Sequence, residues 1–159
     1  MGPCEMDLRE IADRLALREL VDRYAQTADL RDRSQRDAQV DRVFSEDAVL
    51  VGPGFELRGR EQIRTGLRAI ERYEATLHAV HGQIIELHGD DADGDTVCTA
   101  SHLHETDGRP MKLDWGIRYR DRYRREPDGW RIVRRELHVV WEQDLPLQLG
   151  SSERDEGEK

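Results

Sequence analysis

Cysteine is scarce in this sequence, and long apolar runs and an excess of positive charge are missing. The two cysteines, Cys4 and Cys98, lie far apart and form no CxxC pair, which argues against a disulfide framework and fits a reducing cytoplasm. No apolar run approaches the roughly 20 residues that a membrane span needs, and the N-terminus lacks the apolar core of a signal peptide. We therefore predict a cytoplasmic protein without a membrane partner.

The balance of charge is acidic, with 34 Asp and Glu against 25 Lys and Arg and a formal net charge of −9. Phosphate binding needs a basic face, so we predict no nucleic-acid partner. One basic run contains Arg118, Arg120, Arg122, Arg124 and Arg125, with Tyr119 and Asp121 between them. We interpret this run as the solvated face of a strand.

Cofactor-binding motifs are also missing, since the chain has neither a GxGxxG sequence nor a P-loop. Metal ligands could in principle come from Asp29 and the histidines, but no histidine pair has the HxxxH spacing of a helical zinc site. We therefore predict that the protein uses no cofactor and no metal.

The N-terminal half has the periodicity of amphipathic helices. Between Asp7 and about Leu30, apolar residues recur at steps of three and four: Ile11, Leu15, Leu17, Leu20, Val21, Tyr24, Ala25 and Ala28. A short second helix is predicted over 35–44, followed by a short strand that contains Val49 and Val51. A third helix is predicted over 59–73, with Ile63, Leu67 and Ile70 on its inner stripe.

After Tyr73 the pattern changes to long strands joined by short polar turns. Strands are predicted over 76–88, 95–105, 111–125 and 130–141, which together make an antiparallel meander. Helices followed by a sheet indicate the α+β class, with a pocket between a long helix and a curved sheet. The length of 159 residues suits one domain, which we place at 7–146 between an N-terminal tail (1–6) and a disordered C-terminal tail (147–159).

An ordered set of short motifs runs from about Ile11 to Trp141. The motifs are Arg23-Tyr24-Ala25 with Asp29 and Asp32, Val43-Phe44 with Asp47-Ala48-Val49, Gly59-Arg60-Glu61-Gln62-Ile63, Thr76-Leu77-His78, Gly89-Asp90 with Ala92, and Asp128-Gly129-Trp130-Arg131-Ile132 with Arg135 and Trp141. This set resembles the SnoaL-like proteins of the nuclear transport factor 2-like superfamily.

The resemblance implies a cone-shaped α+β barrel whose N-terminal helices pack in the concave face of a curved, mostly antiparallel sheet. The superfamily includes polyketide cyclases, ketosteroid isomerases, scytalone dehydratase, bile acid 7-alpha dehydratase, limonene epoxide hydrolase and non-catalytic binding subunits, so the fold does not decide the chemistry. The resemblance also implies a homodimer formed through the outer sheet face, with Trp115, Trp141 and the 111–123 strand as contributors.

Four residues are predicted to be catalytic: Tyr24, Asp29, His78 and His102. Tyr24 and Asp29 stand near the end of the first helix, and His78 begins the strand expected beside it. A Tyr, an Asp and a His at one apolar pocket can remove a proton and protonate a leaving hydroxyl, as elimination requires. This arrangement resembles that of the bile acid dehydratase and of scytalone dehydratase, and His102 would be the second pocket histidine of the latter.

We expect His78 to act as general base, Asp29 to orient it, Tyr24 to donate a hydrogen bond, and His102 to be a reserve acid. Tyr24 could instead be a core residue, and Asp29 a helix-end hydrogen-bond acceptor. His81, His104 and Trp115 are predicted to bind substrate. Alternation puts His81 on the face of Leu77 and Ala79, and only a bulge would bring it beside His78.

The predicted function is a cofactor-independent lyase or isomerase, dehydratase- or cyclase-like, acting on a hydrophobic polyketide- or steroid-like ring. The alternative is a non-catalytic binding or assembly module of the same fold. An epoxide hydrolase needs an Asp-Arg-Asp relay on adjacent strands, which this sequence does not offer. The arginine in the last strand of the bile acid dehydratase also lacks a counterpart, and Val139 falls near its place.

Overall fold

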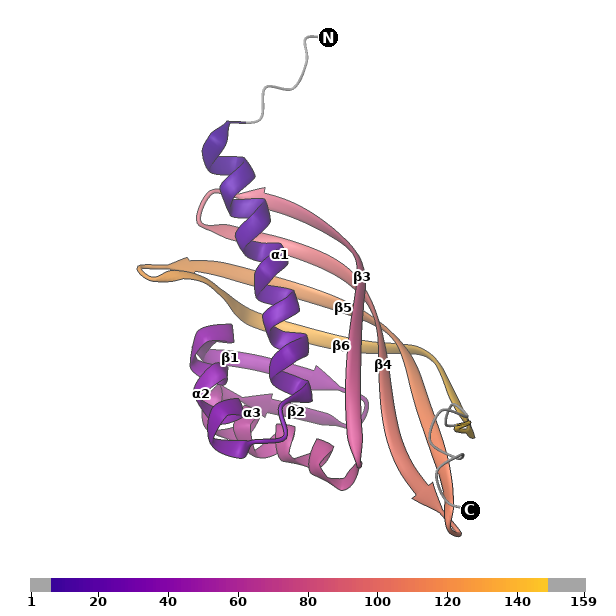
Figure 1. Ribbon diagram of the computed structural model, residues 1–159. Coiled ribbons are helices and arrows are strands. Elements are labelled where there is room, and N and C mark those ends of the chain that lie inside the picture. The colour runs from indigo at the N-terminus through magenta and orange to yellow at the C-terminus, as the bar shows by residue number, and fades with distance from the viewer. Residues whose placement is uncertain (1–6, 149–159) are drawn as a thin grey trace, which may run out of the picture.

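The first helix, α1 (Leu8–Asp29), lies across the concave side of a curved sheet (Figure 1). The structure is a computed structural model that describes residues 7–148, so the predicted N-terminal tail and nearly all of the C-terminal one lie outside it. The Asp7 carboxylate caps α1 by accepting a hydrogen bond from the Glu10 backbone N–H. The predicted apolar stripe is buried only from Leu17 onward, because Ile11 and Leu15 point away from the sheet and are exposed.

The sheet has six strands in the order β2-β1-β6-β5-β4-β3. Their bounds are β1 (Phe44–Gly52), β2 (Phe55–Arg58), β3 (Ala75–His88), β4 (Asp91–Thr106), β5 (Arg109–Glu126) and β6 (Gly129–Pro146). β1 and β6 pair in parallel, and the remaining pairs are antiparallel. The predicted α+β class and the meander β3 to β6 are therefore confirmed, and the sheet curves without closing on itself (Figure 1).

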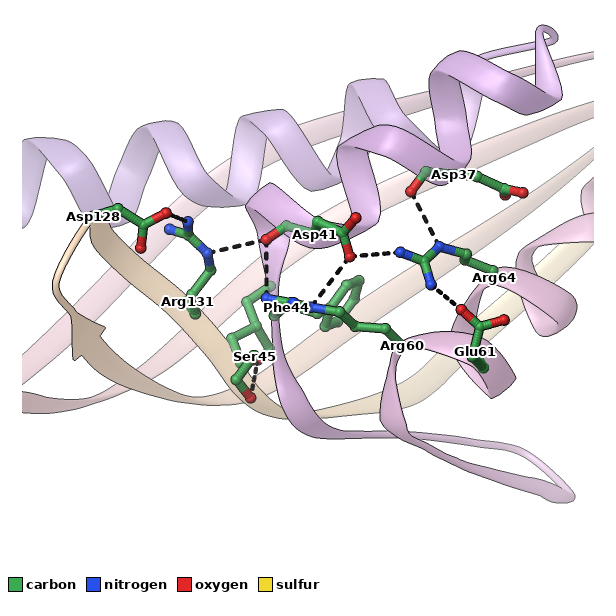
Figure 2. A network of polar contacts seen from close by, with 10 residues as sticks. Asp37, Asp41, Phe44, Ser45, Arg60, Glu61, Arg64, Asp128 and Arg131 are labelled. Atoms are coloured by element: carbon green, nitrogen blue, oxygen red, sulfur yellow. Dashed lines mark hydrogen bonds and ion pairs between the residues drawn. The ribbon is translucent and has the colours of Figure 1, made fainter.

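Two shorter helices, α2 (Arg33–Val43) and α3 (Gly59–Leu67), lie beside β1 and β2. The third predicted helix tightens after Leu67 into the 3-10 segment η1 (Arg68–Arg72). Figure 2 shows how arginines hold these elements together: Arg60 donates to the Phe44 carbonyl and Arg131 to the Asp41 carbonyl. Carbonyls at a helix end have no partner within the helix, so these contacts satisfy them while tying α2 to α3 and β6.

The arginine run of β5 confirms the interpretation of a solvated strand face only in part, because Arg124 and Arg125 are half-buried and Arg125 pairs with Asp13 of α1 at 2.5 Å. Arg118, Arg120 and Arg122 are exposed on the outer side of the sheet, whereas Tyr119, Asp121 and Tyr123 alternate with them and are buried on the inner side. Among residues 7–148, no helix is both long and apolar enough to cross a membrane.

Candidate active site

A cavity of about 440 Å³ lies between the end of α1, the segment α3–η1 and the inner face of the sheet. Four predicted site residues line it, each from a different element: Tyr24, His78, His102 and Trp115. Most of the remaining wall is apolar and includes Leu50, Phe55, Leu57, Leu67, Ile70, Ile117 and Leu137. The volume falls in the range of small-molecule pockets, so the cavity can hold a ligand of a few rings.

Asp29 forms a hydrogen-bonded pair with His78, which lines the cavity, although Asp29 itself is not among the lining residues. The His78 Nδ1 lies 2.7 Å from the Asp29 Oδ1, and the His78 backbone N–H donates to the Oδ2 at 2.8 Å. The Thr76 hydroxyl donates to the same carboxylate at 2.8 Å. Burial alone would raise the pKa of Asp29, but these hydrogen bonds outweigh it and hold the pKa below its usual value.

The ionised Asp29 carboxylate fixes the tautomer of His78. A carboxylate only accepts hydrogen bonds, so the proton of a neutral His78 ring resides on Nδ1 and the Nε2 lone pair is left for a substrate. His78 is 7% exposed at the side chain, whereas its neighbours Leu77 and Ala79 are exposed on the opposite face. The pair therefore has the geometry of a general base held in place by a carboxylate.

His102 faces the same cavity from β4. Its ring centre lies 6.0 Å from that of His78, 5.0 Å from Trp115 and 4.6 Å from Tyr73. Its Nδ1 lies 3.1 Å from the Leu113 carbonyl oxygen, so Nδ1 carries the proton and Nε2 is free. Burial, together with the charges of His78 and Arg72, lowers the pKa of His102. Near neutral pH the His102 ring is therefore a neutral hydrogen-bond acceptor rather than a protonated acid.

The lowered pKa of His102 predicts a pH-dependent contribution to stability. Below its unfolded pKa of about 6.5, the unfolded chain takes up a proton more readily than the folded chain, so this contribution to stability is lost as the pH falls. Urea unfolding at neutral and mildly acidic pH should show a smaller acid loss in His102→Gln than in the wild type. His81→Gln removes an exposed histidine and is the control. Equal pH dependence of wild type and His102→Gln would contradict the prediction.

Tyr24 borders the deep end of the cavity and is also part of the core. Its ring makes edge contacts with Phe44 and Tyr119, and the Arg135 guanidinium lies 4.1 Å from its centre. Burial raises the pKa of Tyr24, and the Arg135 charge opposes that rise only in part. The hydroxyl is therefore protonated at neutral pH and available as a hydrogen-bond donor. The two interpretations of Tyr24, core residue and pocket residue, both hold.

Trp115 lies inside the cavity rather than on the outer face where a dimer contact was expected. It follows the alternation of β5, on which Ile117 also lines the cavity. Its Nε1–H is buried and has no hydrogen-bond partner among residues 7–148. A buried donor without a partner costs free energy, so this N–H is an unsatisfied polar group behind the cavity wall.

Two of the predicted substrate-binding residues are not among the lining residues. β3 has a register shift between Val80 and Gln83, but His81 stays exposed, with its Nε2 2.9 Å from the Thr99 hydroxyl. The His104 Nε2 lies 3.0 Å from Asp144. Among residues 7–148, no group of three or more His, Cys, Asp or Glu side chains is placed to hold a metal ion.

Sequence reasoning missed two residues at the mouth of the cavity, Arg72 and Tyr73. Tyr73 stands where the periodicity changes from that of a helix to that of a strand. This position could have indicated a cavity residue, because a residue between a helix and the strand packed against it borders the space between the two elements.

A family model for the SnoaL-like domain matches residues 9–136. A protein of Mycobacterium tuberculosis (strain ATCC 25618 / H37Rv), named only as uncharacterised, is 30% identical over 133 residues, which cover 82% of this chain and 87% of the relative.

Solved structures share the architecture at lower identity. One, from Novosphingobium aromaticivorans, is provisionally named a scytalone dehydratase; it has a TM-score of 0.72 and 21% identity, over 87% of this chain and 91% of that one. A hexachlorocyclohexane dehydrochlorinase of Novosphingobium barchaimii LL02 has a TM-score of 0.73 and 16% identity, over 89% and 94% of the two chains. At these identities the two likenesses show the fold alone.

Proposed function

This chain belongs to the SnoaL-like domain family, and we propose that its cavity is the active site of a cofactor-independent lyase or isomerase. The position of His78 in the wall of an apolar cavity, with its ring hydrogen-bonded to Asp29, carries this proposal. A histidine oriented by a carboxylate is suited to removing a proton from carbon beside a carbonyl group or ring. The dehydratase and dehydrochlorinase names among the structural neighbours support the elimination class.

The proposed substrate is an apolar cyclic molecule, polyketide- or steroid-like, and the proposed reaction is loss of water. The His78 Nε2 takes the proton, and the ionised Asp29 stabilises the imidazolium that results. The C–H electron pair forms the new double bond, the C–O bond breaks, and His78 returns the proton to the departing oxygen as water. If the substrate already holds a double bond near its carbonyl group, the C–H electrons can instead move onto the carbonyl oxygen; the C–O bonds then stay intact, and return of the proton by His78 to another carbon gives double-bond migration.

A hydrogen-bond donor in the cavity would stabilise the oxygen on which negative charge develops. The hydroxyl of Tyr24 is the candidate for this role. The neutral Nε2 of His102 would accept a hydrogen bond from a substrate hydroxyl. A pocket with an apolar wall makes each of these interactions stronger than it is in water.

The proposed function can be tested by incubating the protein with a panel of hydroxylated polycyclic ketones. Mass spectrometry would report loss of water, and ultraviolet absorbance would report a conjugated double bond. We expect at least one compound to be converted by the wild type. If compounds bind and all are recovered unchanged, the cavity belongs to a binding module.

We also propose that the protein pairs as a homodimer through the outer face of the sheet. Ala79, Thr99, Gly116 and Trp141 are paired in one row across β3, β4, β5 and β6. Leu77 beside this row is 66% exposed and Trp141 within it is 48% exposed. Exposed apolar side chains grouped on one face are typical of an interaction surface.

Leu77→Arg should therefore convert a dimer into a monomer. An unpaired charge buried at the interface raises the dimer dissociation constant by at least about tenfold. Sedimentation velocity at micromolar concentration measures the change. Glu86→Arg, an exposed substitution further along the same strand, is the control and should remain dimeric. A wild-type protein that sediments as a monomer would show that the proposal is wrong.

A further inference from the structure

We propose that the substrate carries an anionic group of the carboxylate class, which Arg72 binds at the mouth of the cavity while the apolar rings lie beside His78. This inference deepens the proposed function and rests on it. The argument begins with the charge of the cavity wall. Among the residues that line it, Arg72 is the sole Lys or Arg, and no Asp or Glu is present.

Arg72 is exposed and has no carboxylate partner within residues 7–148. Its guanidinium lies 4.9 Å from the ring centre of Tyr73 and donates to the Tyr73 hydroxyl at 2.9 Å. By contrast, Arg68 in the same segment lies 3.6 Å from the Asp37 carboxylate. In a chain with more acidic than basic residues, the cavity mouth thus retains a cation that is held in place by an aromatic ring but not neutralised.

A continuous row of rings connects Arg72 with the proposed base. The Tyr73 ring lies 4.6 Å from that of His102, which in turn lies 6.0 Å from that of His78. A flat apolar molecule against this wall would have one end at His78 and the other at the guanidinium. Since guanidinium presents a planar fork of donors that matches a carboxylate, an anionic substituent at the outer end is the complementary group.

A competition experiment separates the charge of the ligand from its shape. N-phenyl-1-naphthylamine serves as the fluorescent reporter of the cavity, and 2-naphthoate and 2-naphthamide, which differ mainly in charge, compete with it near neutral pH. We expect the wild type to prefer naphthoate by roughly fivefold, the upper range for a solvent-accessible ion pair. Higher ionic strength should reduce this preference.

Variants then assign the preference to one side chain. Arg72→Met should abolish the preference for naphthoate and leave the affinity for naphthamide nearly unchanged, and Arg72→Lys should retain part of it. Arg68→Met, which removes the same charge outside the cavity lining, should leave the preference intact. A merely structural role of Arg72 would instead lower the affinities for both competitors equally.

The inference is overturned if the wild type shows no preference, if Arg72→Met leaves the preference unchanged, or if the reporter does not bind the cavity. Because the assay measures binding without turnover, its outcome is independent of whether His78 is a base. A naphthoate preference together with unimpaired turnover by His78→Ala would retain the anionic ligand and reject the proposed chemistry.

Discussion

With a substrate in hand, His78→Ala lowers kcat by roughly 10²–10⁴, the usual contribution of a general acid–base group. The reason is geometric: His78 is the residue whose ring both contacts an ionised carboxylate and faces the cavity, so its free Nε2 is the base. The substitution removes this nitrogen without opening the packed core, because His78 borders a cavity. Steady-state kinetics of product formation measures the loss.

His81→Ala is the matched control, because His81 stands on the same strand but is exposed on the opposite face, and it should retain the wild-type rate. Asp29→Asn should also slow the reaction, since it removes the charge that stabilises the imidazolium and fixes the Nδ1 tautomer. Circular dichroism establishes whether each variant is folded. A folded His78→Ala protein that turns substrate over at the wild-type rate would contradict the role of His78.

The order of elements could be predicted because their signals are local. The spacing of Leu17, Leu20, Val21 and Tyr24 marks a helix, and the alternation after Tyr73 marks strands. The position of β1 could not be predicted, because it pairs in parallel with β6, some 80 to 90 residues later in the chain. Such a pairing depends on tertiary packing, for which periodicity carries no signal.

The side of the sheet on which each histidine lies could be predicted from the two-residue period of a strand, which puts His78 inside and His81 outside. The contact between Asp29 and His78 could be expected from the resemblance, and also because Asp29 stands near the end of the first helix and His78 begins the strand predicted beside that helix. What remained hidden was the identity of partners on the inner face. In the sequence, Asp121 stands between arginines of its own strand, but the arginine that it pairs with, Arg135, lies on the next strand.

Arg135→Met is expected to lower the free energy of unfolding by about 3–5 kcal/mol, the cost of removing one partner of a buried ion pair. Arg135 and Asp121 are both 0% exposed at their side chains and share two hydrogen bonds of 2.7 and 2.6 Å. The Tyr123 hydroxyl also donates to Asp121 at 2.6 Å. After the substitution this single neutral donor is left to stabilise a buried carboxylate.

Urea unfolding measures the loss, and two further variants identify its origin. Arg134→Met removes a neighbouring arginine whose partner, Glu136, is partly exposed, and should change stability by no more than about 1 kcal/mol. Asp121→Leu combined with Arg135→Met should recover much of the stability, because no unpaired charge remains. A loss of stability for Arg135→Met as small as that for Arg134→Met would show that the pair does not stabilise the core.

The double variant also separates stability from chemistry. Since the Arg135 guanidinium lies 4.1 Å from the Tyr24 ring, we expect the double variant to be a folded protein whose Tyr24 is a poorer hydrogen-bond donor and whose turnover is reduced.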